Sequence, residues 1–331
     1  MSAKKYQLVG IGNAVVDMIA RAGDDFLAQM DIEKGIMQLV DQERGETLYG
    51  AMQDPVMTPG GSVANTIAGA GNLGLRCAFI GRVKDDAPGL FYEKAMRDEG
   101  IDFVNPPVAG GGLATSRSMI FVAPDGERSM NTYLGISAEL GPEDVSEEVT
   151  AQAEVIFLEG YLFDKDKGKD AFLRAARTCR AAGGKAGIAI SDPFCVERHR
   201  EDFLQLIANE MDFVIGNEDE IKSLYQNNDL DKDLAAVAAV CPLVVCTRSG
   251  DGVSIIMDGQ RTDVPVQRQV PVDATGAGDQ FAAGFIYALV TGADMQTAGQ
   301  MGSAAAGEVI SHIGPRPECD LQDLFREKGL I

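Results

Sequence analysis

The sequence is poor in positive charge, histidine and aromatic residues. Its 331 residues include no tryptophan and two histidines, and 29 lysines and arginines stand against 50 aspartates and glutamates. The resulting formal charge of −21 argues against a protein that binds nucleic acid non-specifically or rests on an anionic membrane, because both need a basic face. An acidic protein can still bind a phosphorylated ligand in a local pocket.

Cysteine pairs and long apolar runs are also missing. None of the six cysteines forms a C-x-x-C pair, and with two histidines the chain offers no credible zinc cluster, so we expect reduced core thiols. The longest weakly polar run, residues 281–290, falls far short of the ~18 residues that span a bilayer. The N-terminal residues lack an apolar stretch of signal-peptide length. The sequence therefore predicts a soluble, cytoplasmic protein.

Short apolar runs alternate with longer helical patterns along most of the chain. The predicted strands are residues 6–9, 77–80, 155–158, 186–190, 213–215 and 243–247. The predicted helices are residues 62–72, about 86–98, about 168–182, about 277–291 and about 295–311. This alternation is typical of an α/β protein with a mainly parallel sheet covered by helices on both faces.

Two stretches interrupt the alternation, at about residues 18–55 and 108–135. Both contain short strand-like runs, such as Gln38–Val40 and Ser118–Val122, and the second also has a Pro-Asp-Gly turn at 124–126. Such a turn is a good hairpin signal. Two insertions of this kind can form one small antiparallel sheet, and we expect that sheet to be a lid beside the α/β core.

Most glycine-rich segments are poor candidates for phosphate binding. Residues 69–74 match G-x-G-x-x-G, but they lie at the end of a helical stretch and before a strand, the reverse of a dinucleotide site. We interpret Gly74 as the residue that ends that helix. Gly10 and Gly12 do follow a strand, yet Val15 replaces the third glycine, and no G-x-x-x-x-G-K-[ST] motif occurs.

The segment V-D-A-T-G-A-G-D-Q-F-A-A-G at 272–284 carries the strongest chemical signal. A β-compatible run, residues 264–272, leads into a glycine turn that opens a helix rich in alanine and glycine. Backbone N–H groups at the start of such a helix are unpaired and bind anions. Asp279, in the first turn, can take a proton from an alcohol held beside that anion, although a carboxylate there can also serve only the helix dipole. The pattern favours phosphoryl transfer to a hydroxyl group.

Four blocks in order resemble those of the ribokinase-like (phosphofructokinase-B-type) family of carbohydrate and nucleoside kinases. They are G-G-S-V-A-N at 60–65, N-E-D-E at 217–220, T-R-S-G-D-G at 247–252 and D-A-T-G-A-G-D at 273–279. In the third block Ser249 and Gly250 are offset from the family's T-x-G-x-x-G. The resemblance implies one kinase domain over residues 1–331, a three-layer α/β/α sandwich with a small β-sheet lid.

The resemblance also implies the catalytic roles. Asp279 would be the general base that deprotonates the acceptor hydroxyl as it attacks the γ-phosphate of ATP. The amides of Gly276, Ala277 and Gly278 would stabilise charge on the transferring group. Arg128, in the second lid segment, would reach the γ-phosphate; the alternative is a solvated arginine on a hairpin.

On the nucleotide side, the resemblance places Asn217 and Glu220 at a Mg²⁺–phosphate site, partly through water, which suits a cation that retains several waters. The alternative is that the pair is only a helix N-cap with its capping-box glutamate. Asp273 matches a position that contributes to a monovalent-cation site, for K⁺, in some members. The other implied nucleotide-binding residues are Thr247, Gly250, Gly252 and Thr275.

On the acceptor side, Asn13 and Asp17 follow the first strand, and a carboxylate that accepts hydrogen bonds from two neighbouring hydroxyls can grip a sugar diol. A turn or hinge carboxylate is the alternative for Asp17. The residues implied to complete this grip at the start of the next helix are Gly60, Gly61, Ser62 and Asn65.

Several features resemble the adenosine-kinase branch of that family, among them G-I-G-N-A-V-V-D at 10–17 and D-P-F at 192–194. Tyr161 and Phe194 would then pack on a nucleobase, or else be ordinary aromatics, and Gln38 is a candidate to read the base. The predicted reaction is phosphorylation of a nucleoside hydroxymethyl group, adenosine to AMP. The alternatives are a kinase of fructose, ribose or a related sugar, and a catalytically silent nucleoside binder. The expected partner is a small molecule, bound by a monomer or homodimer.

Overall fold

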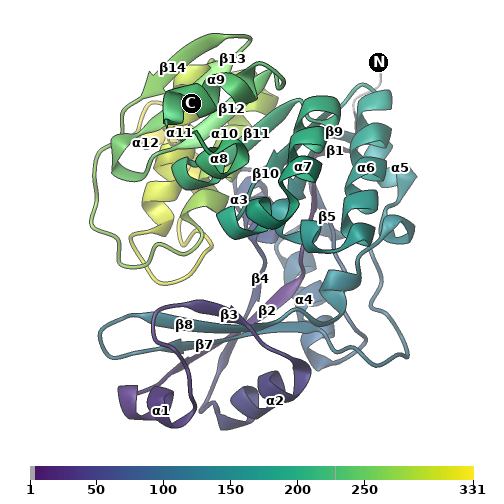
Figure 1. Cartoon of the computed structure of the whole chain (residues 1–331), viewed down its shortest axis with the longest axis vertical. Coiled ribbons are helices and arrows are strands. Elements are labelled where there is room, and N and C mark those ends of the chain that lie inside the picture. The colour runs from purple at the N-terminus through teal and green to yellow at the C-terminus, as the bar shows by residue number, and fades with distance from the viewer. Residues whose placement is uncertain (1–3, 228) are drawn as a thin grey trace.

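The computed structural model describes residues 4–227 and 229–331, which form two sheets (Figure 1). The large sheet has nine strands in the order β14-β13-β12-β11-β10-β9-β1-β5-β6. In chain order these strands are β1 (Tyr6–Ile11), β5 (Cys77–Ile80), β6 (Asp102–Phe103), β9 (Ala153–Glu159), β10 (Lys185–Ala189), β11 (Phe213–Asn217), β12 (Leu243–Thr247), β13 (Val253–Met257) and β14 (Gln260–Val264). From β12 to β6 all neighbours are parallel, and β13 and β14 add an antiparallel edge.

Helices cover both faces of the large sheet. One face carries α3 (Ser62–Asn72), α4 (Ala87–Asp98), α10 (Ala277–Thr291), α11 (Met295–Val309) and α12 (Leu321–Glu327). The other carries α5 (Glu147–Ala151), α6 (Asp166–Ala181), α7 (Pro193–Glu210), α8 (Glu218–Tyr225) and α9 (Leu230–Ala238). Four 3-10 turns complete the core: Gly135–Glu139, Pro142–Asp144, Gly160–Asp164 and Ser249–Asp251. The predicted three-layer α/β/α sandwich is confirmed.

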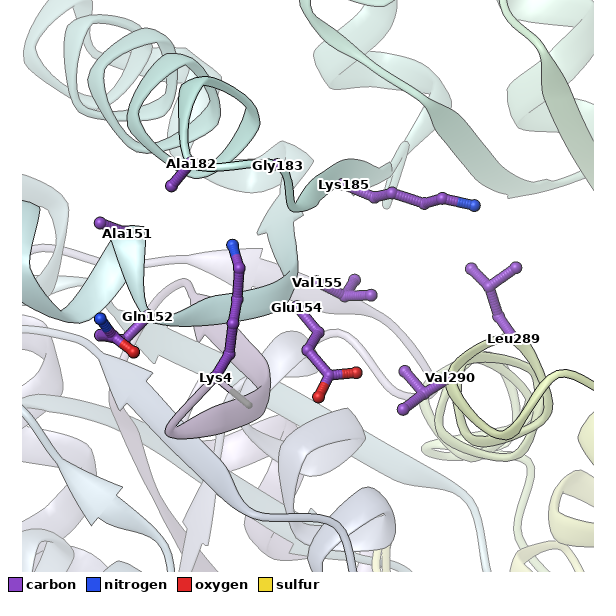
Figure 2. Close-up of a pocket in the computed structure, with 10 residues that line it drawn as sticks. All are labelled: Lys4, Ala151, Gln152, Glu154, Val155, Ala182, Gly183, Lys185, Leu289 and Val290. Atoms are coloured by element: carbon purple, nitrogen blue, oxygen red, sulfur yellow. The ribbon is translucent and has the colours of Figure 1, made fainter. Parts of the chain in front are cut away.

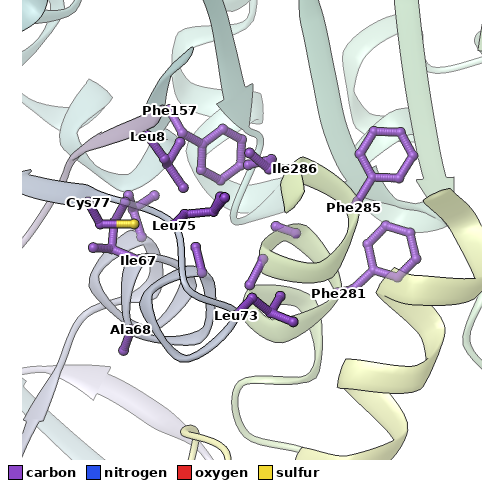
Figure 3. Packing of buried hydrophobic residues seen from close by; sticks show 14 of the residues in the cluster. Leu8, Ile67, Ala68, Leu73, Leu75, Cys77, Phe157, Phe281, Phe285 and Ile286 are labelled. Atoms are coloured by element: carbon purple, nitrogen blue, oxygen red, sulfur yellow. The ribbon is translucent and has the colours of Figure 1, made fainter. Parts of the chain in front are cut away.

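Two apolar cores lie on either side of the sheet, because successive strand residues point to opposite faces. In β9, Phe157 belongs to one core and its neighbours Ile156 and Leu158 belong to the other. Figure 3 shows Phe157 beside Ile286 of α10, with α3 and α10 packed under the sheet. This packing fixes the starts of α3 and α10 relative to each other.

The second sheet, which we call the small sheet, has the strand order β3-β8-β7-β2-β4. Its strands are β2 (Val15–Arg21), β3 (Met37–Leu39), β4 (Val56–Gly60), β7 (Ser116–Val122) and β8 (Arg128–Tyr133). Helices α1 (Asp24–Gln29) and α2 (Gln42–Ala51) pack on one face. Its strands therefore span 15–60 and 116–133, against the predicted insertions 18–55 and 108–135.

The prediction of an antiparallel small sheet is wrong in part. The pairs β2–β7 and β3–β8 are parallel, and β2–β4 and β7–β8 are antiparallel. Each insertion leaves the large sheet through its first long strand, so β2 and β7 run in the same direction, and the returning strands β4 and β8 flank them. The strands are local, but their mutual direction depends on how both insertions leave the core.

Four further expectations from the sequence can be compared with the structure, and they concern a helix end, the run at 264–272, the cysteines and membrane spans. Gly74 ends α3 with φ +84°, and its N–H donates to the Gly71 carbonyl, as expected of a helix-terminating glycine. The β-compatible run at 264–272 does not form a strand: β14 ends at Val264, and residues 265–276 form a loop that carries two prolines, which lack an N–H for a strand ladder. Five cysteines are buried as expected, but Cys319 is exposed. Within residues 4–227 and 229–331 no helix is long and apolar enough to cross a membrane.

Candidate active site

A cavity of about 1300 Å³ lies between the small sheet and the carboxyl ends of the parallel strands. In open α/β sheets ligands bind at those ends of the strands. Polar side chains follow or end five of the strands and line this cavity: Asn13, Glu159, Ser191, Asn217 and Thr247. The starts of α3 and α10 and one face of the small sheet supply the remaining walls.

A second hollow, of about 700 Å³, lies at the opposite end of the strands (Figure 2). It is lined by Lys4, Lys185 and the starts of β9 and β10, with Leu289 and Val290 from the end of α10. None of the candidate residues lies there. The chemistry predicted from the sequence therefore belongs to the larger cavity.

Asp279 sits in the first turn of α10 and is held by the first turn of α3. The Ser62 hydroxyl donates to its Oδ1 at 2.7 Å, and Asn65 Nδ2 donates to its Oδ2 at 3.0 Å. Ser62 and Asn65 had been assigned to the acceptor grip, but their hydrogen bonds orient the predicted base. Asp279 lines the cavity, so a carboxylate fixed by two donors faces the space where a hydroxyl can bind.

Burial raises the pKa of four of the carboxyl groups that line the cavity. Burial raises the pKa of Asp279 to about 6, with its two hydrogen bonds and the charge of Arg316 acting against the rise. Burial likewise raises the pKa of Asp17, Glu159 and Glu220 to about 7 each. Asp279 therefore has the lowest pKa of the four and is the group best suited to be ionised at neutral pH.

The start of α10 leaves backbone donors free. Gly276 adopts φ +80°, and a Cβ there would lie 2.6 Å from Pro315 Cα, so only glycine suits this turn. Among the described residues no hydrogen bond engages the N–H of Gly276, Gly278 or Asp279, whereas the Ala277 N–H lies 3.3 Å from the Ala274 carbonyl. A Cβ on Gly278 would meet nothing within 4 Å. Unpaired donors beside open space suit a phosphate, with Ala277 the weakest donor of the three predicted.

Asp17 projects from β2 into the cavity. Within residues 4–227 and 229–331 no protein group donates a hydrogen bond to its carboxylate, so both oxygens are free to accept from a ligand. Gly60 and Gly61 make room for it and for Asn13: a Cβ on Gly60 would lie 2.4 Å from Asp17 Oδ2, and one on Gly61 would lie 2.1 Å from the Asn13 carbonyl. The glycine pair thus permits the carboxylate to lie against the start of α3.

Glu159, at the end of β9, was not predicted as a site residue. It is 1% exposed, and its Oε1 accepts from Asn13 N and Nδ2 at 3.1 and 2.7 Å. Its Oε2 accepts from the Val63 N–H at 3.0 Å, at the start of α3. Asn13 Oδ1 in turn accepts from Ser137. Asn13 lines the cavity, but its side chain is engaged by Glu159 and Ser137. A carboxylate directly after a buried strand was the only signal in the sequence.

Asp273 is fully engaged within the protein. Its Oδ1 accepts from the Thr275 N–H and hydroxyl at 3.1 and 2.7 Å, and its Oδ2 accepts from the Gly314 N–H at 2.9 Å. Arg128 Nη2, from β8, lies 2.7 Å from the same Oδ2, with both side chains 8% exposed. This arrangement does not suit a K⁺ ion on Asp273, since a guanidinium already neutralises that carboxylate. The ion pair between Arg128 and Asp273 also joins the small sheet to the loop before α10.

Asn217 and Glu220 form the capping box that the sequence offered as the alternative. Asn217 Oδ1 accepts from the Glu220 N–H at 2.9 Å, and Glu220 accepts from Asn217 N and Nδ2 at 2.9 and 2.7 Å. Both residues also line the cavity. No three His, Cys, Asp or Glu side chains of the described residues group closely enough to hold a metal ion alone. Any Mg²⁺ beside this pair would therefore have to be held partly through water.

The other predicted nucleotide-side residues surround the same end of the cavity. The residues of this group that line it are Thr247, Gly250, Gly252 and Thr275. Gly252 has φ +96°, and a Cβ there would lie 2.4 Å from the Val264 carbonyl. Arg268, from the loop after β14, donates to the Gly250 carbonyl at 3.1 Å. The loop formed by the β-compatible run is thus a wall of the cavity.

Of the two aromatic residues predicted to pack on a nucleobase, one lines the cavity and the other does not. Tyr161 lines the cavity, whereas Phe194 does not and is 68% exposed. Asp192 caps α7 through the N–H groups of Phe194 and Cys195, which buries Cys195 and turns Phe194 outward. Gln38 faces away from the cavity, where it donates to Asn131 at 2.6 Å. Neither Phe194 nor Gln38 therefore reaches a ligand in this structure.

Comparison with known proteins points to one family. A model of the pfkB family of carbohydrate kinases matches residues 32–321. The 5-dehydro-2-deoxygluconokinase of Bacillus subtilis is 30% identical over 263 residues, which are 76% of this chain and 80% of that protein.

Two solved structures are more similar over nearly the whole chain. The chain superposes on a probable sugar kinase from Rhizobium etli with a TM-score of 0.90 and 42% identity, covering 99% of this chain and 100% of that one. It superposes on the adenosine kinase from Sinorhizobium meliloti with a TM-score of 0.89 and 43% identity, covering 98% and 99%. The described cavity therefore lies in a fold shared with kinases of both names.

Proposed function

Because this chain belongs to the pfkB family of carbohydrate kinases, and so is an ATP-dependent phosphotransferase that acts on a sugar hydroxyl, we propose that its acceptor is the hydroxymethyl group of a nucleoside, with adenosine converted to AMP. One observation carries the nucleoside assignment. The Asp17 carboxylate, free to bind a ribose diol, stands in the same cavity as an apolar wall of the small sheet.

That wall consists of side chains from β3 and β8. Met37 and Leu39 are 46% and 57% exposed and line the cavity, together with Met130. A flat nucleobase gains from apolar contact of this kind, whereas a free sugar needs hydrogen-bond partners over most of its surface. Tyr161, which has a pKa raised by burial, adds an aromatic face to the same cavity.

The reaction follows from the two helix starts. Asp279 takes the proton of the acceptor hydroxyl, whose oxygen forms a bond to the γ-phosphorus while the bond from that phosphorus to the bridging oxygen breaks and ADP leaves. The N–H groups of Gly276 and Gly278 bind the oxygens of the transferring group, with Ala277 contributing less. Desolvated donors next to an ionised base are what in-line transfer to an alcohol requires.

The remaining polar residues would hold Mg²⁺-ATP, the Mg²⁺ neutralising phosphate charge. Asn217 and Glu220 are the residues placed to hold the cation through water. Arg128 would exchange its partner Asp273 for a γ-phosphate oxygen, since both are anions within reach of β8. The residues proposed for the rest of the nucleotide are Thr247, Gly250, Gly252 and Thr275.

The charge around Asp17 disfavours a sugar acid as acceptor. The two arginines whose charge lowers the pKa of Asp17 are Arg316 and Arg128, and they are paired with Glu99 and Asp273. The cavity-lining Lys165 and Arg198 pair with Glu139 and Asp164. A gluconate carboxylate beside Asp17 would therefore have to displace the partner of Arg316 or Arg128, the two cations that act on that carboxylate. The relationship to a gluconokinase at 30% identity and to a probable sugar kinase at 42% keeps a free sugar as the second candidate.

The test is ADP release from Mg²⁺-ATP against adenosine, inosine, guanosine, cytidine, ribose, fructose and 5-dehydro-2-deoxygluconate. Turnover with adenosine that is lost in Met37→Lys, which places a charge on the apolar wall, supports the proposal. Turnover with a free sugar or the gluconate alone would overturn the nucleoside assignment. Binding of adenosine without turnover would instead identify a silent binder.

A further inference from the structure

Arg316 lies close enough to Asp279 for its charge to act on that carboxylate. It belongs to the loop between α11 and α12, and its side chain is 16% exposed. Its Nη1 donates to both carboxylate oxygens of Glu99, at 2.6 and 2.5 Å, and its Nε donates to Asn65 Oδ1 at 3.3 Å. Arg316 is not among the residues that line the cavity. Its hydrogen-bond contact with the site runs through Asn65.

Asn65 links Arg316 to Asp279 through hydrogen bonds at both ends of its side-chain amide. Its Nδ2 donates to Asp279 Oδ2 at 3.0 Å. A side-chain amide has one accepting end and one donating end. With its oxygen held by the Arg316 guanidinium, Asn65 must present its NH₂ group to Asp279. Without Arg316 the amide is free to turn over, and its oxygen would then face a carboxylate.

The loop that carries Arg316 is attached to the same helix as the base. Gln280 Nε2 donates to the Asn65 carbonyl at 3.0 Å and to the Pro315 carbonyl at 2.9 Å. Gln280 is fully buried and follows Asp279 in α10. Pro315 also packs against Gly276, where a Cβ would lie 2.6 Å from Pro315 Cα. Arg316 is thus held in a fixed position relative to Asp279.

The charged groups that act on Asp279 come from several elements of the fold. Three carboxylates face it, from β2, β9 and α8: Asp17, Glu159 and Glu220. Arg316 is the cation whose charge lowers the pKa of Asp279, and Arg128 acts with it on Asp17. Removing Arg316 would leave an amide of unfixed orientation and a base among three acidic groups.

We propose that Arg316 is a positioning residue for the general base: it fixes the amide of Asn65, which aims the Asp279 carboxylate at the acceptor hydroxyl. The proposal rests on the proposed function only for the role of Asp279 as base. It adds a residue that touches neither substrate nor nucleotide.

The kinetic test compares Arg316→Met and Arg316→Lys with the wild-type enzyme over pH 5–9. Arg97→Met is the matched control, since Arg97 is a surface arginine paired with Glu93 at 2.8 Å. For Arg316→Met we expect the acidic limb of kcat to move up by roughly one pH unit, because an ionised partner is lost. The KM for ATP should stay within about twofold, and Arg316→Lys should recover much of the shift. Arg97→Met should leave the profile in place.

A purely structural role predicts a different result. In that case kcat of Arg316→Met would fall by the same factor at every pH, in step with a lower melting temperature, and Arg316→Lys would not restore the limb. A profile for Arg316→Met that superimposes on the wild-type profile would overturn the proposal outright.

A second measurement needs no acceptor and so separates this proposal from the proposed function. The native pKa of Asp279, about 6, lies above its ordinary value of 3.8, so its ionisation costs stability as pH rises through that window. Loss of Arg316 raises the native pKa further and extends the loss to higher pH. The loss of urea-unfolding stability caused by Arg316→Met should therefore grow from pH 5 to pH 8, and grow less in an Asp279→Asn background. Equal growth in both backgrounds would refute the coupling, whichever substrate the enzyme uses.

Discussion

Two helices of this protein, α3 and α10, begin unlike most of the others. Eight described helices start at an Asp, Asn or Ser whose side chain accepts a backbone N–H, as Asp294 does for α11. Both α3 and α10 start instead at a glycine with positive φ, Gly61 at +102° and Gly276 at +80°, without a side-chain cap. They pack against each other, and both starts line the cavity.

The two starts differ in what satisfies their free donors. At α3 the chain supplies its own anion, because Glu159 Oε2 accepts from the Val63 N–H. At α10 the N–H groups of Gly278 and Asp279 have no hydrogen-bond partner among the described residues. A helix start attracts an anion in either case. The first is thus part of the scaffold, and we infer that the second is reserved for the ligand's phosphate.

The comparison gives a reason why the proposed base, Asp279, stands on α10 and is held by α3. Ser62 and Asn65 sit in the first turn of α3, where Glu159 binds the Val63 N–H, and both donate to Asp279. The helix whose start has no such protein anion, α10, carries the proposed base itself. A rigid first turn thereby orients a carboxylate beside an anion site, which is the geometry that transfer to a hydroxyl needs.

The largest effect is expected where the base is removed. Asp279→Asn keeps the side-chain shape and should lower kcat by about two to four orders of magnitude, because a general base contributes that much. In the wild type, kcat should fall about tenfold per pH unit below pH 6, since burial raises the pKa of Asp279 to about 6 and the base must be ionised. Steady-state ADP release measures both. A loss of less than tenfold would mean that another group takes the proton.

The next effect concerns the start of α3. Gly61→Ala places a Cβ 2.1 Å from the Asn13 carbonyl in a backbone with φ +102°, so we expect at least about 1–3 kcal/mol of lost unfolding free energy. Gly23→Ala is the matched control, because Gly23 starts α1 with φ −77° and a Cβ there meets nothing within 4 Å. Urea denaturation of both variants tests this. Equal stability of the two would contradict a strict need for glycine at 61.

A smaller and purely functional effect is expected at the start of α10. A Cβ on Gly278 meets nothing within 4 Å, so Gly278→Ala should fold with an unchanged melting temperature. The added methyl occupies the space that a phosphate oxygen needs, and losing one charge-assisted hydrogen bond should lower kcat/KM for ATP by about tenfold. The same ratio for Gly23→Ala should not change. An unchanged kcat/KM in Gly278→Ala would place the phosphate elsewhere.

The sequence was informative where the site is local. The segment 273–279 carries the free backbone donors and the proposed base within seven residues, and α3 and α10 begin at the predicted residues. Interactions between distant segments were not predictable. Glu159 and Arg316 meet the base region only because β9 and the loop after α11 are brought there by the fold. A hydrogen-bonding partner that distant leaves no periodicity or spacing in the sequence.

The wrong predictions of side-chain orientation and strand direction have a similar origin. Phe194 is an aromatic residue of the kind that stacks on a nucleobase. The Asp192 cap, however, determines which face of the first turn of α7 points inward. The strand direction in the small sheet follows from how two insertions leave the core, and each insertion alone reads equally well as an antiparallel hairpin. Residue type was therefore a better guide than orientation, because orientation is set by neighbours far along the chain.

The smallest effect is expected at an ordinary capped helix, which completes the comparison. Asp294 accepts from the Thr297 N–H at 2.8 Å at the start of α11. Asp294→Ala should lose about 1 kcal/mol of unfolding free energy, since the freed N–H is solvated instead, and Asp294→Ser should restore most of it. Neither change should alter kcat or KM, because this donor serves only the helix. If Asp294→Ala lowered kcat as strongly as Gly278→Ala, the distinction between helix starts that close the scaffold and the one that binds phosphate would fail.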